Sequence, residues 1–393
     1  MSVLEQRLRG VLGGFVARGE VPGLVGLVHH RGETHVVPVG TLERGGGAAV
    51  EADSIFRIAS LTKAVTAAAA MILVEECVLR IDDPIDDLVP ELAGRRVLRA
   101  LDAPLDDTVP ATRPITVRDL LTFRLGTGQL LTEDGADFPI LRAMRDPRID
   151  RGPDGPGSGP GEWLARLGAL PLMYQPGERW IYHTAADVLG VLIARAAGKP
   201  LHDFMTERIF EPLGMYDTGY RLPAGKLRRL AGSYRPDGSG GVTPRPDPRV
   251  WDEPPPFPSG GGGPGLLSTA PDYAAFCRML LAQGRHDRGR ILSRAGPVRM
   301  GRRARHRGLH RSVGGAGGRA VHPGGDDLAG GAQGLRGLLD RDVHLDRPAP
   351  RPVFRKIRWI CGVSGDFAAH NSEGDGWRSR SARCYGACDT PPG

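Results

Sequence analysis

The chain has few lysines, aromatic residues and cysteines, and it has no long apolar run. Only four of its 52 basic residues are lysine, and aromatic residues make up 6% of its 393 residues. No stretch approaches the roughly 18 to 20 apolar residues of a membrane-spanning helix. Its five cysteines show neither zinc-site spacing nor a convincing disulfide framework. We therefore expect no membrane partner, no metal site and no other cofactor.

The N-terminal stretch also lacks the features of a secretory signal. Residues 1–16 carry charged side chains among apolar ones at helical spacing, without an uninterrupted apolar segment or a cleavage site. The expected location is therefore the cytoplasm. With 40% hydrophobic residues, the chain can build a sizeable core in one large or two ordinary domains.

The net charge of +7 is concentrated at the C-terminal end. From Arg299 onward there are 17 Lys and Arg residues against 9 Asp and Glu, whereas the preceding chain has 35 against 36. No aromatic residues that could stack on bases are spaced among these arginines. We therefore expect no nucleic-acid partner.

Hydrophobic periodicity and turn residues predict regular elements along the first three quarters of the chain. The expected strands form a hairpin, 24–30 and 34–39, around the Arg31-Gly32 turn. Helices are expected over 1–18, after Ser60, over 114–122 with Thr116 as a possible cap, over 188–197, and from Pro271. The Gly- and Pro-rich stretch 152–161 predicts a surface loop.

Ser60-Leu61-Thr62-Lys63 is the most informative motif of the chain. Three residues make nearly one helical turn, so Ser60 and Lys63 are expected to point the same way and bring an amine beside a hydroxyl. Such a pair fits a serine nucleophile with its own proton acceptor. Taken alone, the motif also fits Ser60 as a helix N-cap and Lys63 as a solvated residue.

A second candidate is Tyr182, which stands just before the apolar helix predicted over 188–197. A tyrosine beside a catalytic lysine can relay a proton, because a nearby ammonium favours the phenolate. Tyr182 also fits a core aromatic residue with its hydroxyl at the edge. Its neighbour His183 is expected to be an exposed or hydrogen-bonded histidine rather than a base.

Several segments occur in an order that resembles the serine β-lactamase and penicillin-binding-protein superfamily. The closest likeness is to class C β-lactamases and family VIII esterases, and it covers roughly residues 1–296. The segments are Phe56-Arg57-Ile58-Ala59 before Ser60 to Lys63, Ile115 to Thr122, Tyr182 with Asp187-Val188-Leu189-Gly190, Phe210 to Met215, and Gly260 to Tyr273. The ordered set carries the resemblance rather than any single motif.

The resemblance implies an α+β, β-lactamase-like fold, with a mostly antiparallel sheet flanked by helices beside an all-helical region and the active site between them. It implies acyl transfer, with Ser60 as acylated nucleophile, Lys63 as its activating partner, Tyr182 as proton relay, and the Ser60 amide as half of the oxyanion hole. The family's Tyr-x-Asn is Tyr182-His183-Thr184 here. Thr184 is therefore the substrate-binding candidate, and its shorter side chain favours ester cleavage over recognition of a β-lactam amide.

The predicted function is a serine hydrolase that cleaves a small ester or amide through an acyl-enzyme on Ser60. The alternatives are a β-lactamase or D-alanyl-D-alanine carboxypeptidase, and a catalytically impaired remnant. The last alternative arises because no persuasive third motif of the family is present. His322-Pro323-Gly324 matches His-x-Gly by its letters, but no strand pattern surrounds it. The oligomeric state cannot be read from the residues.

Residues 297–393 predict an aberrant Arg/Gly-rich tail, in contrast to a hydrolase domain over 1–296. We hypothesise a frameshift that disrupted the C-terminal strands. A Met codon followed by any Gly codon contains a Trp codon when it is read one base later. At Met300-Gly301, codons allowed for the following residues let this shifted frame read Trp-Asp-Gly-Gly. Resequencing codons 290–360 tests this, and an intact frame without that reading contradicts it. A genuinely disordered tail is the alternative.

Overall fold

The structure is a computed structural model that describes residues 2–130, 137–149, 158–238, 242–245, 254–255, 257–261, 263, 265–293 and 358–361. The chain divides into two compact units, Met1–Arg294 with Arg358–Gly393, and Ala295–Ile357. The second unit lies outside the described residues, as do His322-Pro323-Gly324 and most of the predicted tail. The division of the chain at residue 296 therefore stays a prediction.

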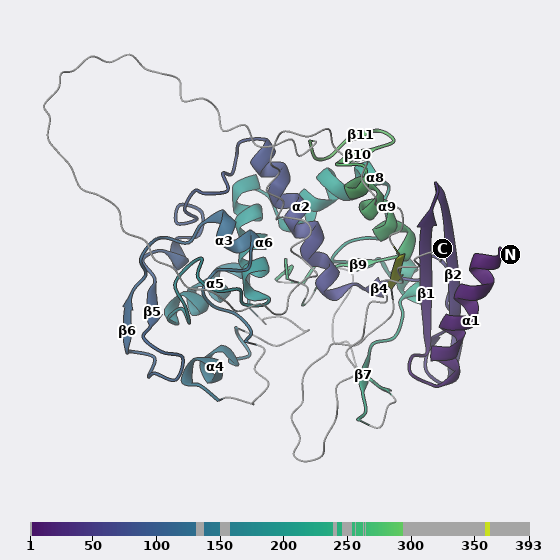
Figure 1. Cartoon of the computed structure of the whole chain (residues 1–393), viewed down its shortest axis with the longest axis horizontal. Helices are drawn as coiled ribbons and strands as arrows, with labels where there is room; N and C mark the ends of the chain where they lie inside the picture. Colours follow the sequence, from purple (N-terminus) through teal and green to yellow (C-terminus); the bar gives the residue numbers. More distant parts are fainter. Residues whose placement is uncertain are drawn as a thin grey trace, which may run out of the picture. The chain divides into compact units, whose positions relative to one another are not determined.

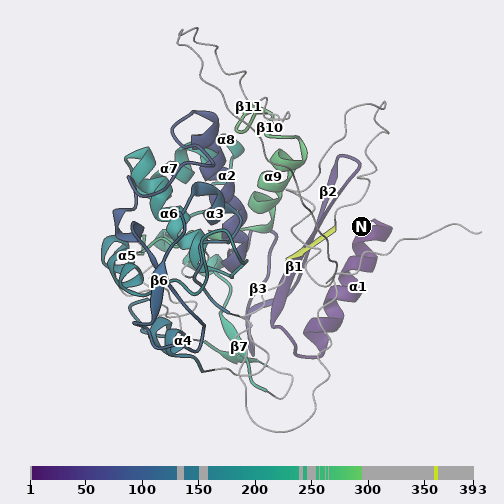
Figure 2. The same cartoon turned by 60° about the vertical axis from the view of Figure 1, so that its left-hand side comes forward.

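An antiparallel sheet with strand order β12-β1-β2-β3 forms one part of the first unit (Figures 1 and 2). Its strands are β1 (Gly23–His30), β2 (Glu33–Glu43), β3 (Gly46–Ala49) and β12 (Arg358–Cys361). The predicted hairpin is confirmed, with β1 and β2 in register from His30 opposite Glu33 to Gly23 opposite Gly40. Arg31 and Gly32 both have positive φ, 52° and 86°, as a two-residue hairpin turn matching the strand twist requires.

Helices cover both faces of this sheet, which explains the nearly continuous apolar run of β1. Helix α1 (Val3–Ala17) packs against one face and α9 (Ala270–Leu281) against the other (Figures 1 and 2). Alternate residues of β1 point to opposite faces. Leu24 therefore joins a cluster with Leu12 of α1, whereas Val25 joins one with Ala270 and Ala274 of α9. A strand buried on both faces is apolar at successive positions rather than at every second one.

The helical part is centred on α2 (Thr62–Glu75) and α6 (Thr184–Ala197), which pack against each other within the largest hydrophobic cluster. The other helices are α3 (Val117–Leu121), α4 (Pro139–Met144), α5 (Pro160–Ala169), α7 (Leu201–Met205) and α8 (Glu211–Leu213), with a π-helical turn (Thr206–Phe210) between the last two. Two-stranded ladders join β4 (Phe56–Arg57) to β9 (Leu267–Ser268), β5 (Arg96–Leu98) to β6 (Thr108–Pro110), β7 (Tyr234–Pro236) to β8 (Val242–Pro244), and β10 (Arg285–His286) to β11 (Gly289–Arg290).

Most local predictions are confirmed, with two corrections. The Thr116 side chain caps α3 by accepting a hydrogen bond from the Asp119 backbone N–H, and the Asp119 carboxylate accepts one from the Thr116 backbone N–H in a capping box. Helix α2 begins at Thr62, and Ser60, which was expected to share its first turn with Lys63, belongs to a preceding 3₁₀ turn. The predicted loop 152–161 is too long at its end, since Pro160 and Gly161 begin α5, where Pro favours the first turn. Residues 152–157 lie outside the described part.

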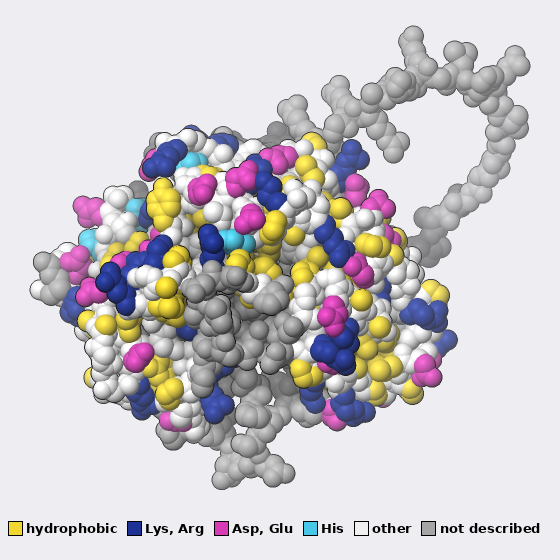
Figure 3. Space-filling view, turned by 180° about the vertical axis from the view of Figure 1, so that it is seen from behind, with side chains coloured by type: hydrophobic (Ala, Val, Ile, Leu, Met, Phe, Trp, Pro, Cys, Tyr) yellow, Lys and Arg dark blue, Asp and Glu magenta, His cyan; other side chains and the backbone are white. Residues whose placement is uncertain are grey.

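On the face of the molecule shown in Figure 3, the acidic and basic side chains of the described residues are interspersed. None of the helices in the described ranges is both long enough and apolar enough to cross a bilayer.

Candidate active site

Ser60 lies where a strand leads directly into a helix. Strand β4 pairs with β9, and the Ile58 backbone N–H then donates to the Leu266 carbonyl oxygen at 3.0 Å. The 3₁₀ turn Ala59–Leu61 follows, with Ala59 at a φ of 42°, a conformation that costs a non-Gly residue energy and often occurs at functional sites. Ser60 is exposed. Because α2 has no side-chain cap, the interpretation of Ser60 as its N-cap is wrong.

The side chains of Ser60, Lys63 and Tyr182 lie within hydrogen-bonding reach of one another. The Ser60 Oγ is 2.7 Å from the Tyr182 hydroxyl and 3.0 Å from Lys63 Nζ, and Lys63 Nζ is 3.4 Å from the Tyr182 hydroxyl. Lys63 Nζ also lies over the Tyr182 ring, 4.7 Å from its centroid, a cation–π geometry. The half-buried side chains of Lys63 and Tyr182 are therefore two alternative proton acceptors for the exposed Ser60 hydroxyl.

Tyr182 is held in place through its backbone. The Gln129 backbone N–H donates to the Tyr182 carbonyl oxygen at 2.9 Å. Gly128, with a φ of 153°, permits this approach, because a Cβ there would lie 2.5 Å from the same oxygen. The Thr184 backbone N–H donates to that oxygen at 3.2 Å, and His183 between them has φ 81° and ψ −72°. These values describe a classic γ-turn, a strained conformation that turns the chain from Tyr182 into α6.

His183 and Asp187 complete the surroundings of Lys63. His183 Nδ1 is 3.3 Å from Lys63 Nζ, and His183 Nε2 is 3.2 Å from the Asp187 Oδ2. Asp187 Oδ1 accepts a hydrogen bond of 2.7 Å from the Gly261 backbone N–H, and the Gly261 carbonyl oxygen accepts one from Lys63 Nζ. Lys63 is thus in contact with α6 and with the Gly-rich segment before β9.

The structure brings three of the four predicted site residues together and places the fourth differently. Thr184 begins α6 with only 5% of its surface exposed, and among the described residues no hydrogen bond joins its side chain to Ser60, Lys63 or Tyr182. Its substrate-binding role stays a prediction. His183, one residue earlier, is the side chain beside Lys63. The expectation of a hydrogen-bonded histidine is thus confirmed, but sequence reasoning missed its connection to Lys63.

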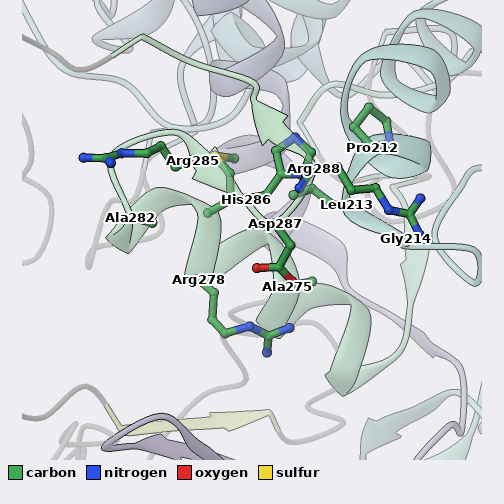
Figure 4. Close-up of a pocket in the computed structure, with 11 residues that line it drawn as sticks. Pro212, Leu213, Gly214, Ala275, Arg278, Ala282, Arg285, His286, Asp287 and Arg288 are labelled. Carbon is green, nitrogen blue, oxygen red and sulfur yellow. The ribbon is translucent and has the colours of Figure 1, made fainter.

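A hollow of about 430 Å³ formed by α8, α9 and the β10–β11 hairpin does not contain this cluster. In Figure 4 the side chains of Arg278, Arg285 and Arg288 at its rim point in different directions rather than toward one centre. No group of three or more His, Cys, Asp or Glu side chains that could hold a metal occurs in the described part of the chain. The cluster around Ser60 is therefore the better candidate for an active site.

A serine at a strand-to-helix junction with lysine and tyrosine at its hydroxyl provides the groups that serine hydrolases use to activate a nucleophile. Comparison with known proteins agrees, since the β-lactamase family model matches residues 8–348. Because this match covers more than half of the chain, the chain belongs to the β-lactamase family. The fold predicted from the resemblance is thereby confirmed. The matched region extends beyond residue 296, where the resemblance was expected to stop.

Individual relatives include hydrolases. Protein Rv1367c of Mycobacterium tuberculosis strain H37Rv is 42% identical over 280 residues, covering 70% of this chain and 66% of the relative. Esterase EstB of Burkholderia gladioli is 30% identical over 284 residues, covering 66% of each chain. The solved structure of EstCE1, described as a hydrolase with promiscuous acyltransferase activity, has a TM-score of 0.61 at 25% identity and covers 75% of this chain and 76% of its own.

The aligned region thus spans slightly less than two thirds of the length of these two curated relatives. At a general level, the family and its members support a serine hydrolase.

Proposed function

We propose that this protein hydrolyses small carboxylic esters through an acyl-enzyme on Ser60. The observation that carries the proposal is the convergence of Lys63 Nζ and the Tyr182 hydroxyl on the Ser60 Oγ, at 3.0 and 2.7 Å. A serine hydroxyl is a weak nucleophile unless a neighbouring group removes its proton during attack. Two such groups are within the reach that general-base catalysis requires.

The proposed reaction has two halves. The Ser60 Oγ attacks the ester carbonyl carbon while its proton passes to Tyr182 or Lys63, and the alcohol then leaves with a proton returned by the same groups. Water attacks the acyl-enzyme in the second half, giving the carboxylic acid and restoring the Ser60 hydroxyl. The Ser60 backbone amide is the proposed first donor to the oxyanion, as the family resemblance implies.

An ester is favoured over a β-lactam or a peptide by the relatives and by Thr184. EstB is named an esterase and EstCE1 a hydrolase, while Thr184 stands where the family's amide-binding Asn is expected. Transfer of the acyl group to an alcohol instead of water is a second candidate, favoured by the acyltransferase activity described for EstCE1. Product analysis with added alcohol distinguishes the two, since transfer yields a new ester.

The test is covalent labelling of Ser60 followed by ester turnover. The purified chain is treated with a fluorophosphonate, its intact mass is measured, and Ser60→Ala is treated in parallel. A single adduct that the variant lacks, together with hydrolysis of a short p-nitrophenyl ester, supports the proposal. A folded chain that gains no adduct and cleaves no ester contradicts it and favours the catalytically impaired remnant. Turnover of a β-lactam or D-alanyl-D-alanine peptide in preference to esters would favour the alternative hydrolases.

A further inference from the structure

We propose that His183 and Asp187 form a positioning pair that holds Lys63, with Asp187 selecting the histidine tautomer that Lys63 needs. This inference rests on the proposed function and deepens it. Lys63 Nζ contacts His183 Nδ1 at 3.3 Å, and His183 Nε2 contacts Asp187 Oδ2 at 3.2 Å. Both side chains are mostly buried, with 18% and 8% exposed.

The surroundings of Asp187 determine which ring nitrogen of His183 carries the proton. Asp187 Oδ1 already accepts hydrogen bonds from the Gly261 backbone N–H at 2.7 Å and from the Ser259 hydroxyl at 2.5 Å. An ionised carboxylate has only acceptor oxygens, so its contact with His183 is satisfied when Nε2 carries the hydrogen. The neutral imidazole then presents the lone pair of Nδ1 to Lys63.

The buried Tyr220 hydroxyl does not disturb this order, because it donates to the Ser259 carbonyl oxygen. Tyr220 is fully buried near Asp187, and burial, followed by the charge of Asp187, raises the pKa of its phenol. Tyr220 therefore stays neutral and donates its hydrogen to the Ser259 carbonyl oxygen at 2.9 Å. The charged or titratable groups that contact His183 in the described part are thus Lys63 from α2, Asp187 from its own helix, and the adjacent Tyr182 ring.

The groups around Lys63 supply hydrogen-bond acceptors for its protonated form. An ammonium has three hydrogens and no acceptor. The Gly261 carbonyl oxygen and His183 Nδ1 accept two of them, and the third faces the Ser60 and Tyr182 oxygens. The pair therefore stabilises the ammonium that forms when the Ser60 proton leaves, and it directs the remaining hydrogen toward the reacting oxygen. His183 acts through Lys63 and does not touch the substrate.

The first test reads the tautomer directly and does not depend on activity. Histidine is labelled with ¹⁵N, and the His183 signals are identified by their loss in His183→Asn. At pH 8 we expect the Nε2–H tautomer in the wild-type chain. In Asp187→Asn the new amide NH₂ faces Nε2 as a donor, so we expect a switch to Nδ1–H. A wild-type Nδ1–H tautomer overturns the proposal even if the Asp187 variant fails to fold.

The second test uses steady-state kinetics with a short p-nitrophenyl ester. Asp187→Asn should move the His183 hydrogen to Nδ1, which then faces the Lys63 ammonium as a donor. We therefore expect kcat to fall about 10- to 100-fold, the loss typical when a group that orients a metal ligand is removed, with KM changed less than about twofold. His183→Asn can place an acceptor oxygen near the position of Nδ1, so it should retain more activity than Asp187→Asn. His30→Asn, at the end of β1, is the matched control.

The split between kcat and KM separates positioning from a merely structural role. A pair that positions Lys63 should lower kcat in Asp187→Asn with little change in KM, and the acceptor oxygen of His183→Asn should preserve part of the kcat that Asp187→Asn loses. Unchanged kcat in both variants overturns the proposal. A wild-type chain that cleaves no ester refutes the proposed function instead, while the tautomer measurement still tests the pair.

Discussion

Tyr182 has its hydroxyl within hydrogen-bonding reach of both Ser60 and Lys63. Its hydroxyl is closer to the Ser60 Oγ than Lys63 Nζ is, at 2.7 against 3.0 Å. The lysine above its ring and beside its hydroxyl favours any negative charge that develops on the phenol. A proton leaving Ser60 therefore has its shortest path to Tyr182.

Replacing Tyr182 by Phe removes this path but keeps the ring that packs beside His183. We expect kcat for ester hydrolysis to fall about 10²- to 10⁴-fold, the usual contribution of general acid–base catalysis, with little change in KM. Tyr216→Phe is the matched control, since Tyr216 is 68% exposed. A Tyr182→Phe variant with kcat near that of the control would assign the proton transfer to Lys63 alone.

At the scale of elements, the site depends on the close approach of α6 to the segment 259–261. Gly190 of α6 lies against Gly260, whose Cα and N would be 3.2 Å from an added Cβ. Thr66 of α2 donates to the Gly260 carbonyl oxygen at 2.9 Å from the other side. The segment is therefore held between two helices, and this position brings the Gly261 oxygen to Lys63.

A methyl group at Gly190 should push this segment away from α6. Gly190→Ala should lower the free energy of unfolding by about 1 kcal/mol, the mild end of overpacking, and reduce kcat because the acceptor for Lys63 moves. Gly13→Ala in α1 meets no atom within 4 Å, so it should raise the free energy of unfolding by about 0.5–1 kcal/mol. Urea unfolding and ester turnover measure both variants. Equal effects of the two substitutions would refute the close-packing argument.

At the scale of the whole molecule, carboxyl groups whose pKa values differ between the folded and unfolded chain link stability to pH. Burial raises the pKa of the Asp217 carboxyl, but hydrogen bonds from Arg229 and Lys226 outweigh it, and the net pKa is lowered. The pKa of Asp119 is lowered in the same way by Arg113 and Thr116, again against burial. Burial raises the pKa of Asp272, which acts in the opposite direction.

A carboxyl whose pKa is lowered by folding stabilises the protein above its unfolded pKa of about 3.9, and this contribution is lost as pH falls through the folded value. We therefore expect the free energy of unfolding to decrease below about pH 5. Asp217→Asn should cost about 1 kcal/mol at pH 7, because the pair is partly solvated, and less at pH 3. Asp102→Asn, an exposed carboxylate, is the control. Urea unfolding at both pH values checks this, and a cost at pH 3 equal to that at pH 7 would contradict it.

Local rules were enough to predict much of the fold and the first half of the site. The turn at Arg31-Gly32, the cap at Thr116 and the apolar spacing of α1 act between near neighbours, so they are visible in the sequence. Spacing alone also predicted that Ser60 and Lys63 would face each other. Tyr182 was a candidate from its place before an apolar helix, but only the order of motifs paired it with Ser60, because no local rule joins residues 122 positions apart.

The sequence by itself determined that Ser60 and Lys63 lie side by side, together with the elements that carry them, since these follow from interactions within a few residues. Only the tertiary structure decided that His183 rather than Thr184 lies beside Lys63. That outcome depends on the γ-turn at His183, whose left-handed φ no residue pattern indicates, and on the packing of α6 against Gly260 and Gly261. The i, i+4 spacing of His183 and Asp187 is visible in the sequence. Their position beside Lys63 is not, because it depends on the packing of a second helix.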